Sequence, residues 1–151
     1  VSMGYKGNMF DLQAALLLPQ FSTIEKNLEA RERISRRYRE AFADIPAVAI
    51  PRILPNTRHA HHLFTIRVPA EARDNALADL QAQGVGVAVN YRPVHLLTYY
   101  RESFAFGRGV FPNAERIGDR TLSLPFYPAL RADEVDYVIA AVRNTMGRWQ
   151  A

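Results

Sequence analysis

The chain opens with a long stretch in which apolar residues recur every three to four positions. The repeat runs from about residue 12 to residue 42, and Asp11 precedes it as a good N-cap. This spacing predicts one long helix, kinked or broken near Pro19, because proline removes a backbone hydrogen bond and crowds the preceding turn. The apolar positions of the repeat are Leu12, Ala15, Leu16, Ile24, Leu28, Ile34, Tyr38 and Phe42.

After this helix the period of the pattern changes several times. Residues 43–55 hold three prolines and no helical repeat, so we predict a loop with a short extended piece at 48–50. Residues 61–68 alternate and are rich in β-branched and aromatic side chains, which predicts a strand. Helical spacing returns at 70–83, and Gly84 stands where a left-handed cap would end that helix.

The C-terminal half continues with a predicted strand at 85–91, which Pro93 ends, and a short helix at 113–122. Asp133 is expected to cap a last helix from about residue 134 to residue 146. Its apolar stripe is Val135, Val138, Ile139 and Val142. The order helix, strand, helix, strand, helix, helix predicts an α/β fold of the α+β sandwich kind, in which helices pack on a short sheet.

Composition narrows the class of protein without naming a function. The chain has 151 residues, 48% of them hydrophobic, which is enough to build the core of one domain. Its longest apolar run, residues 14–18, is far shorter than the about 18 residues of a membrane span, and no signal peptide is recognisable. The absence of cysteine excludes disulfides and thiolate metal sites. We therefore expect a cytoplasmic protein without a membrane partner.

Three segments are richer in polar and turn residues than packing requires. Residues 4–11 form a glycine-bearing loop that leads into a helix N-terminus, where a phosphate could bind, although a plain loop is the more common explanation. Residues 90–95 place a phenol, a guanidinium and the imidazole of His95 at a strand end, and this histidine is either functional or structural. Residues 122–128 form a turn that two prolines stiffen.

Two other clusters favour less specific explanations. His59 and His61 could share a face of a strand, but His62 would point the other way and no carboxylate is near in sequence, so we do not expect a metal site. Arginines are frequent between residues 31 and 39, yet glutamates are interleaved with them. A solvated helix face with ion pairs is the better interpretation, and we expect no nucleic-acid partner.

In their order and spacing, these segments resemble the DegT/DnrJ/EryC1/StrS sugar aminotransferases over nearly the whole chain. The first is similar to that family's Gly-Tyr segment after the catalytic lysine, and the others are similar to its His-Leu-Phe, Tyr-x-Pro-x-His, Phe-Pro-x-Ala-Glu and Leu-Ser-Leu-Pro motifs. The matching segments are residues 4–15, 62–66, 91–100, 111–116 and 122–128.

The resemblance implies the C-terminal small domain of a fold-type-I pyridoxal-phosphate transferase. Residues 1–10 would end the large domain as an interface loop, and residues 11–151 would form the small domain with its long linking helix. The whole enzyme would carry an amino group, typically from glutamate, to a keto-sugar nucleotide in polysaccharide or glycoside biosynthesis. The lysine that binds the cofactor would lie upstream of Val1, so no catalytic residue is expected in this chain.

The resemblance also implies partners and contacts. An N-terminal large domain and a second subunit of a homodimer would pack on the chain, and we expect exposed apolar surface on the first helix to receive them. The Gly-Tyr segment of that family typically reaches across the dimer interface, so Lys6 would contact the cofactor phosphate of the neighbouring subunit. Asn8 would also be cofactor-binding, at a position where many relatives have an arginine that could pair with the amino donor's carboxylate. Tyr91, His95 and Tyr5 would face the nucleotide-sugar substrate. A non-catalytic binding or regulatory module of the same fold is the alternative.

Overall fold

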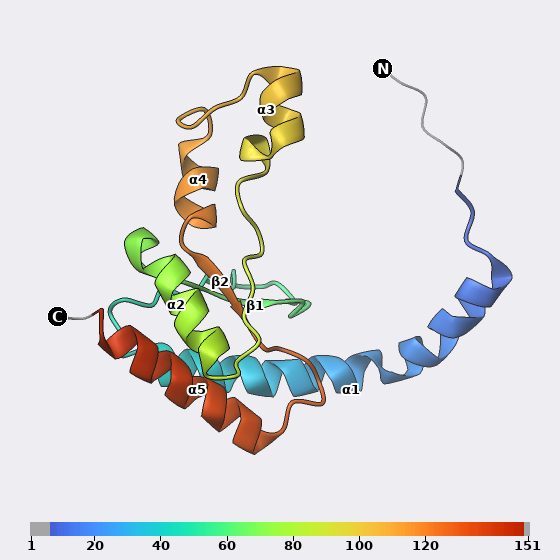
Figure 1. Ribbon diagram of the computed structural model, residues 1–151. Coiled ribbons are helices and arrows are strands. Elements are labelled where there is room, and N and C mark those ends of the chain that lie inside the picture. Colours follow the sequence, from blue (N-terminus) through green and yellow to red (C-terminus); the bar gives the residue numbers. More distant parts are fainter. Residues whose placement is uncertain (1–6, 150–151) are drawn as a thin grey trace.

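The computed structural model describes residues 7–149, and Figure 1 shows helices surrounding a small sheet. In chain order the elements are α1 (Asp11–Phe42), β1 (Phe64–Arg67), α2 (Ala70–Ala82), the 3-10 turn η1 (Val94–Leu96), α3 (Thr98–Phe104), α4 (Pro112–Gly118), β2 (Thr121–Leu124) and α5 (Ala132–Gly147). The predicted class of helices packed on a short sheet is confirmed.

Helix α1 is continuous through Pro19 and bends in its N-terminal part, so the helix is not broken there (Figure 1). Its N-cap is Phe10, whose backbone N–H donates to the Gln13 side chain at 3.2 Å. Asp11 is therefore the first helical residue and not the predicted cap. Its carboxylate still stabilises the helix, because a negative charge in the first turn interacts favourably with the positive end of the helix dipole.

The sheet has two antiparallel strands, with Phe64 opposite Leu124 and Arg67 opposite Thr121. The predicted strand at 85–91 was wrong, because this segment makes one isolated bridge, between Ala88 and Ser123. Backbone groups of the segment bond locally: the Val85 N–H donates to the Leu80 carbonyl at 3.0 Å, and the Val87 N–H to the Val85 carbonyl at 2.9 Å. The second strand is instead β2, where the sequence predicted the end of a helix and a turn.

The other predicted helices exist with shifted ends. Gly84 has φ +77°, so the left-handed position after α2 is confirmed. The N-cap of α5 is Arg131, so Asp133 lies inside the first turn and is not the cap. Helix α4 ends at Gly118 because the following residues enter β2. Helix α3 was not predicted from the sequence. None of its side chains is buried, so it has no apolar stripe that would indicate a helix.

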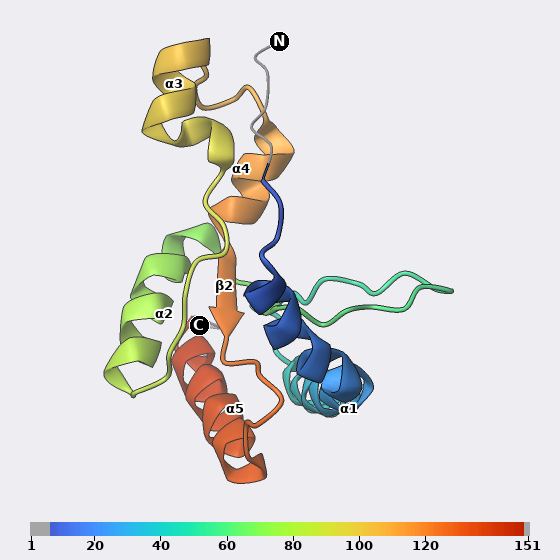
Figure 2. The same ribbon diagram turned by 90° about the vertical axis from the view of Figure 1, so that its right-hand side faces the viewer.

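The core lies between the sheet, α2, α5 and the C-terminal part of α1. Figure 2 shows β2 with α2 on one side and α1 on the other, and α5 below it. Tyr38 packs its ring against Phe42 and Phe64 and donates its hydroxyl hydrogen to the Pro125 carbonyl at 3.0 Å. The residues with no exposed surface at the centre include Ile66, Val68, Leu80, Leu122 and Val142.

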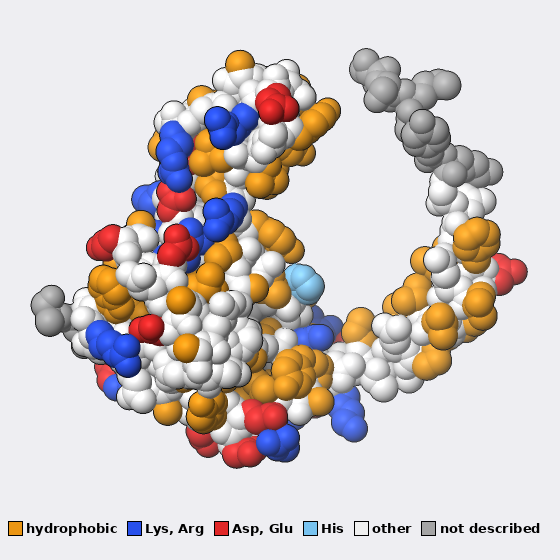
Figure 3. Space-filling view, in the orientation of Figure 1, with side chains coloured by type: hydrophobic (Ala, Val, Ile, Leu, Met, Phe, Trp, Pro, Cys, Tyr) orange, Lys and Arg blue, Asp and Glu red, His pale blue; other side chains and the backbone are white. Residues whose placement is uncertain are grey.

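Two parts of the chain project from this core. The buried positions of α1 begin only at Ala30, so its N-terminal half extends away from the body. Residues 90–118, which we call the arm, carry η1, α3 and α4. Figure 3 shows an open hollow between these projections, with hydrophobic side chains on both. Exposed apolar surface on the first helix is thereby confirmed; its largest exposed side chains are Leu12, Leu16, Leu18, Phe21 and Ile24.

Candidate functional site

The arm begins just after Ala88, where the segment that bridges to β2 turns away from the sheet. Ala88 and Ser123 exchange two backbone hydrogen bonds, of 3.2 and 2.8 Å, and the chain then runs away from the sheet toward η1. The Asn90–Tyr91 peptide bond is cis. The side chain of Tyr91 is 67% exposed, so its hydroxyl is available to a ligand or to another part of a larger protein.

Pro93 and Gly118 hold the base of the arm together. A Cβ atom placed on Gly118 would lie 2.6 Å from Cδ of Pro93, closer than real contacts allow. Helix α4 therefore needs glycine at its end so that the segment before η1 can pass against it. This close approach sets the position of Tyr91 and of the residues that follow it.

His95 in η1 is turned into the arm and is only 7% exposed. Its Nε2 lies 3.1 Å from Oε1 of Glu115 in α4, and the same oxygen accepts the backbone N–H of Gly109 at 2.8 Å. The ring of Phe111 meets the imidazole edge-on, with centroids 4.9 Å apart. One carboxylate thus joins η1, α4 and the turn at Gly109, whose φ of +93° favours glycine.

The charge of Glu115 is maintained by these donors. Burial raises the pKa of Glu115, but the hydrogen bonds from the Gly109 N–H and from His95 together outweigh burial, so the pKa lies below its usual value. A carboxylate only accepts hydrogen bonds, so His95 carries a hydrogen on Nε2. That leaves Nδ1 as the ring atom that is free of Glu115.

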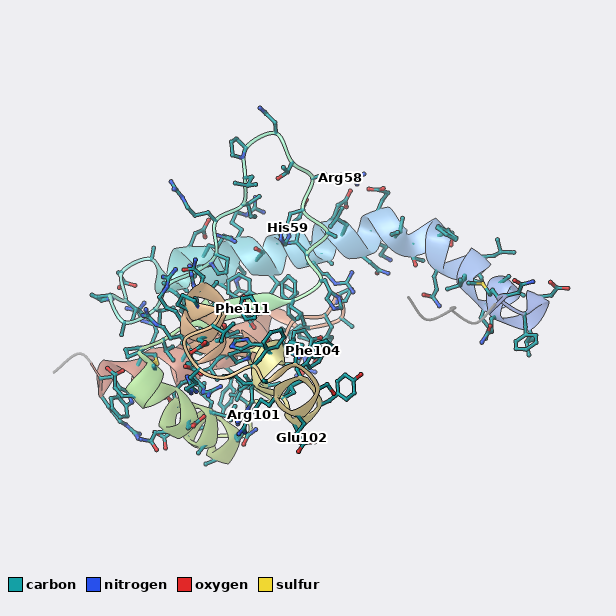
Figure 4. The ribbon with its side chains drawn as sticks, turned by 90° about the horizontal axis from the view of Figure 1, so that it is seen from above. Arg58, His59, Arg101, Glu102, Phe104 and Phe111 are labelled. Carbon is teal, nitrogen blue, oxygen red and sulfur yellow. The ribbon has the colours of Figure 1, made fainter. Side chains whose placement is uncertain are left out.

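Beyond His95 the arm is aromatic. Rings pack in series from Phe111 to Phe106, Phe104 and Tyr100, with centroid separations of 5.4 to 6.1 Å. A cavity of about 460 Å³ beside them is lined by Leu96, Arg101, Phe106, Gly107 and Arg108. Figure 4 shows Arg101, Phe104 and Phe111 on this arm. Arg108 is paired with Asp119 at 2.8 Å, whereas Arg101 has no ion pair within residues 7–149. The arm thus offers apolar rings and a cation side by side.

The predicted site residues do not all come together within one chain. Tyr91 and His95 lie on the arm, whereas Asn8 is exposed in the segment before α1. Figure 1 shows the N-terminal end of α1 well away from α3 and α4 of the arm. Lys6 and Tyr5 lie outside the described residues. The sequence prediction that the Gly-Tyr segment reaches a neighbouring subunit is compatible with this separation, and the roles of all five residues stay predictions.

Within the described residues the only lysine is Lys26, and it is exposed on α1. An exposed amine on a helix surface has no cavity in which a cofactor ring would be held. The location of the cofactor lysine upstream of Val1 stays a prediction. Between residues 7 and 149, no group of three or more histidine or acidic side chains is placed to hold a metal ion.

None of the described helices is long and apolar enough to cross a membrane.

Sequence reasoning missed the role of Glu115 and the whole of α3. Glu115 stood in a matched motif, but nothing in the pattern paired it with His95, which is 20 residues away. The sequence held no signal for this pair, because the burial of His95, which requires a partner for its ring nitrogens, is a property of the folded chain. For α3 the only signal was the pair Tyr100 and Phe104, four residues apart on one helix face.

Residues 1–143 match the DegT/DnrJ/EryC1/StrS aminotransferase family. The chain is 41% identical over 148 residues to the spore coat polysaccharide biosynthesis protein SpsC of Bacillus subtilis, covering 95% of this chain and 38% of that relative. It therefore spans well under half the length of this curated relative.

Solved structures show the same likeness. The fold matches the PLP-form of the putative sugar aminotransferase Spr1654 from Streptococcus pneumoniae with a TM-score of 0.88 and 29% identity, over 98% of this chain and 38% of that one. It matches S. venezuelae DesV with a TM-score of 0.84 and 32% identity, over 90% of this chain and 36% of that one. In both cases the match is to a C-terminal part. This chain belongs to the DegT/DnrJ/EryC1/StrS aminotransferase family.

Proposed function

We propose that this chain is the C-terminal portion of a pyridoxal-phosphate-dependent aminotransferase that moves an amino group from glutamate to a keto-sugar nucleotide. The observation that carries the proposal is the family match over residues 1–143. The S. pneumoniae relative, a putative sugar aminotransferase, has been solved in PLP and PMP forms, which supports this cofactor. The B. subtilis relative acts in spore coat polysaccharide biosynthesis, which supports a role in making a polysaccharide or glycoside.

When bound, the cofactor would supply the electron sink for the amino transfer, and this chain would supply placement. We assign Tyr91 to the sugar-nucleotide substrate because its hydroxyl is exposed at the base of the arm. His95 belongs to the same site, with Nε2 committed to Glu115 and Nδ1 left for a substrate hydroxyl. Lys6, Asn8 and Tyr5 would act from the N-terminal loop: Lys6 on the cofactor phosphate, Asn8 elsewhere on the cofactor side of the site, and Tyr5 on the substrate.

The same proposal includes partners. The chain spans 38% of the B. subtilis relative, which leaves room for an N-terminal large domain that carries the cofactor-binding lysine. We propose that this domain and a second subunit of a homodimer cover the exposed apolar half of α1. Residues 1–10 would then end the large domain, and α1, which begins at Asp11, would link it to the small domain.

The test uses the full-length protein that contains this chain, loaded with pyridoxal phosphate. Glutamate should convert the cofactor spectrum to the amine form, and a keto-sugar nucleotide should reverse it. In Tyr91→Phe we expect the KM for the sugar nucleotide to rise about tenfold, the effect of one lost hydrogen bond, with the glutamate step unchanged. Tyr99→Phe, an exposed phenol on α3, is the matched control and should behave like the wild type.

Equal behaviour of the two variants would remove Tyr91 from the site. A full-length protein that binds no pyridoxal phosphate would favour the alternative, a non-catalytic module of the same fold. The 151-residue chain alone should not be labelled stoichiometrically by pyridoxal phosphate and borohydride. Such labelling at Lys6 would contradict the assignment of the cofactor lysine to a large domain.

A further inference from the structure

A second polar site lies on the face of α1 that turns toward the loop before β1. Arg31, Ser35 and Arg39 are spaced four residues apart, so they share one face of the helix. A small cavity of about 70 Å³ lies between this face and the loop. Its polar lining consists of Ser35, Arg39, Arg52, His59, His61 and Thr65, and we call it the Arg39–His61 pocket.

Arg39 is held in place but its hydrogen-bonding capacity is not exhausted. One Nη2 hydrogen goes to the Pro51 carbonyl at 2.9 Å, and the guanidinium lies over the ring of Phe64, 5.9 Å from its centroid. The Nε atoms of Arg39 and Arg31 are buried and have no hydrogen-bond partner in the described part of the chain. Buried donors without acceptors are costly, so an acceptor at this position would be stabilising.

His61 is buried in the pocket, with 6% of its surface exposed. Its backbone is left-handed, at φ +48°, a conformation that is costly for a residue with a side chain. The His61 N–H donates to Nδ1 of His59 at 3.0 Å, and the two imidazole centroids are 4.6 Å apart. His59 therefore accepts through Nδ1, which leaves its Nε2 as a donor.

The charged side chains that line the pocket are of one sign. Among the described residues no carboxylate lines it, and Arg58 on the same loop is already paired with Glu25. Burial lowers the pKa of His61, and His59, Arg39 and Arg31 lower it further, with Glu32 as the one acid that opposes them. The pocket thus gathers guanidinium cations and imidazole donors with no carboxylate in its lining, and such a set favours a bound anion.

We propose that the Arg39–His61 pocket binds a phosphate-class oxyanion. The guanidinium of Arg39 and the imidazoles of His59 and His61 supply donors that converge on a space of about 70 Å³. That space is a little more than twice the about 30 Å³ that one water occupies, so it admits a single phosphoryl group and not a nucleotide. Figure 4 shows Arg58 and His59 on the loop beside α1, apart from Phe104 and Phe111 on the arm.

The test is calorimetric titration of the 151-residue chain with inorganic phosphate at about pH 6. His61→Asn is the chosen variant, because asparagine tolerates the left-handed backbone that other residues resist. We expect the Kd to rise at least about tenfold in His61→Asn and in Arg39→Gln, since each removes a charge-assisted hydrogen bond. The matched controls are the exposed neighbours His62→Asn and Arg33→Gln, which should stay within about twofold of the wild type.

A second measurement separates binding from folding. A bound anion raises the pKa of His61, so the affinity for the anion should increase as the pH falls from about 8 to 6. Binding should also take up protons, which makes the measured heat differ between buffers of different ionisation enthalpy. Sulfate keeps its charge over this range, so its pH dependence reports the protein alone. His61→Asn should lose the proton uptake while keeping the wild-type circular dichroism spectrum.

Competition identifies the source of the oxyanion. If a nucleoside diphosphate displaces phosphate, the pocket binds the terminal phosphate of a larger ligand. If it does not, the ligand is free phosphate. Both results support an oxyanion site in this pocket. No heat of phosphate binding to the wild type would overturn the proposal. Equal affinity in the wild type, His61→Asn and Arg39→Gln would overturn it as well.

Discussion

His95 illustrates how a residue acquires its role from its surroundings. In the sequence it is a histidine in a loop, and both a functional and a structural role were open. In the folded chain its Nε2 is bound to Glu115, which also holds the turn at Gly109. The residues that shape the site are therefore partly those that hold the arm, and Gly118 is the sharpest example because of its contact with Pro93.

Gly118→Ala should destabilise the chain by about 1–3 kcal/mol, because the new methyl group would collide with Pro93. Urea unfolding measures the loss. Gly147→Ala in α5 is the control, since a Cβ there meets nothing within 4 Å, and alanine should be neutral or stabilise the helix by up to about 1 kcal/mol. If both variants unfold at the same urea concentration, the close approach at Gly118 does not constrain the arm.

At the scale of elements, the two halves of the continuous helix α1 have different surroundings. Its C-terminal half packs on the sheet and on α5, whereas its N-terminal half has no partner in the described chain. The apolar repeat continues through both halves, so periodicity alone could not distinguish a face that is buried in this chain from one that is not. The wrongly predicted strand at 85–91 has a similar origin, because alternation does not reveal which backbone groups bond locally.

The two halves of α1 should respond differently to the same substitution. Phe42→Ala removes a ring that is 1% exposed and should lower the free energy of unfolding by about 3–5 kcal/mol. Phe21→Ala removes a ring that is 66% exposed and should change it by less than about 0.5 kcal/mol in the 151-residue chain. Chemical denaturation of both variants decides the matter, and a large loss for Phe21→Ala would mean that the N-terminal half packs in solution.

At the scale of the whole molecule, the arm and the N-terminal half of α1 enclose a hollow instead of closing on each other. Apolar side chains line both projections (Figure 3). Large exposed apolar patches are uncommon on soluble monomers and usually mark an interaction site. Family membership and the partial length relative to the B. subtilis protein agree with a chain that is completed by other parts.

The 151-residue chain should bind anilinonaphthalene sulfonate through the exposed half of α1. A Leu16→Gln, Phe21→Gln double variant should lose most of the fluorescence, because both side chains are among the exposed apolar groups there. Leu54→Gln, equally exposed but on the loop before β1, serves as the control and should keep it. Strong fluorescence that the double variant retains would place the dye elsewhere.

The sequence by itself determined the family, the fold class and four of the helices, because ordered motifs and apolar periodicity are local properties that a single chain records. It also indicated the position of Gly84, since a left-handed cap is a local requirement. Only the tertiary structure decided that β2 pairs with β1, that Glu115 holds His95, and that Arg39 and His61 converge on one pocket. These contacts join residues that lie from 20 to about 60 positions apart, and their formation depends on packing that no local pattern encodes.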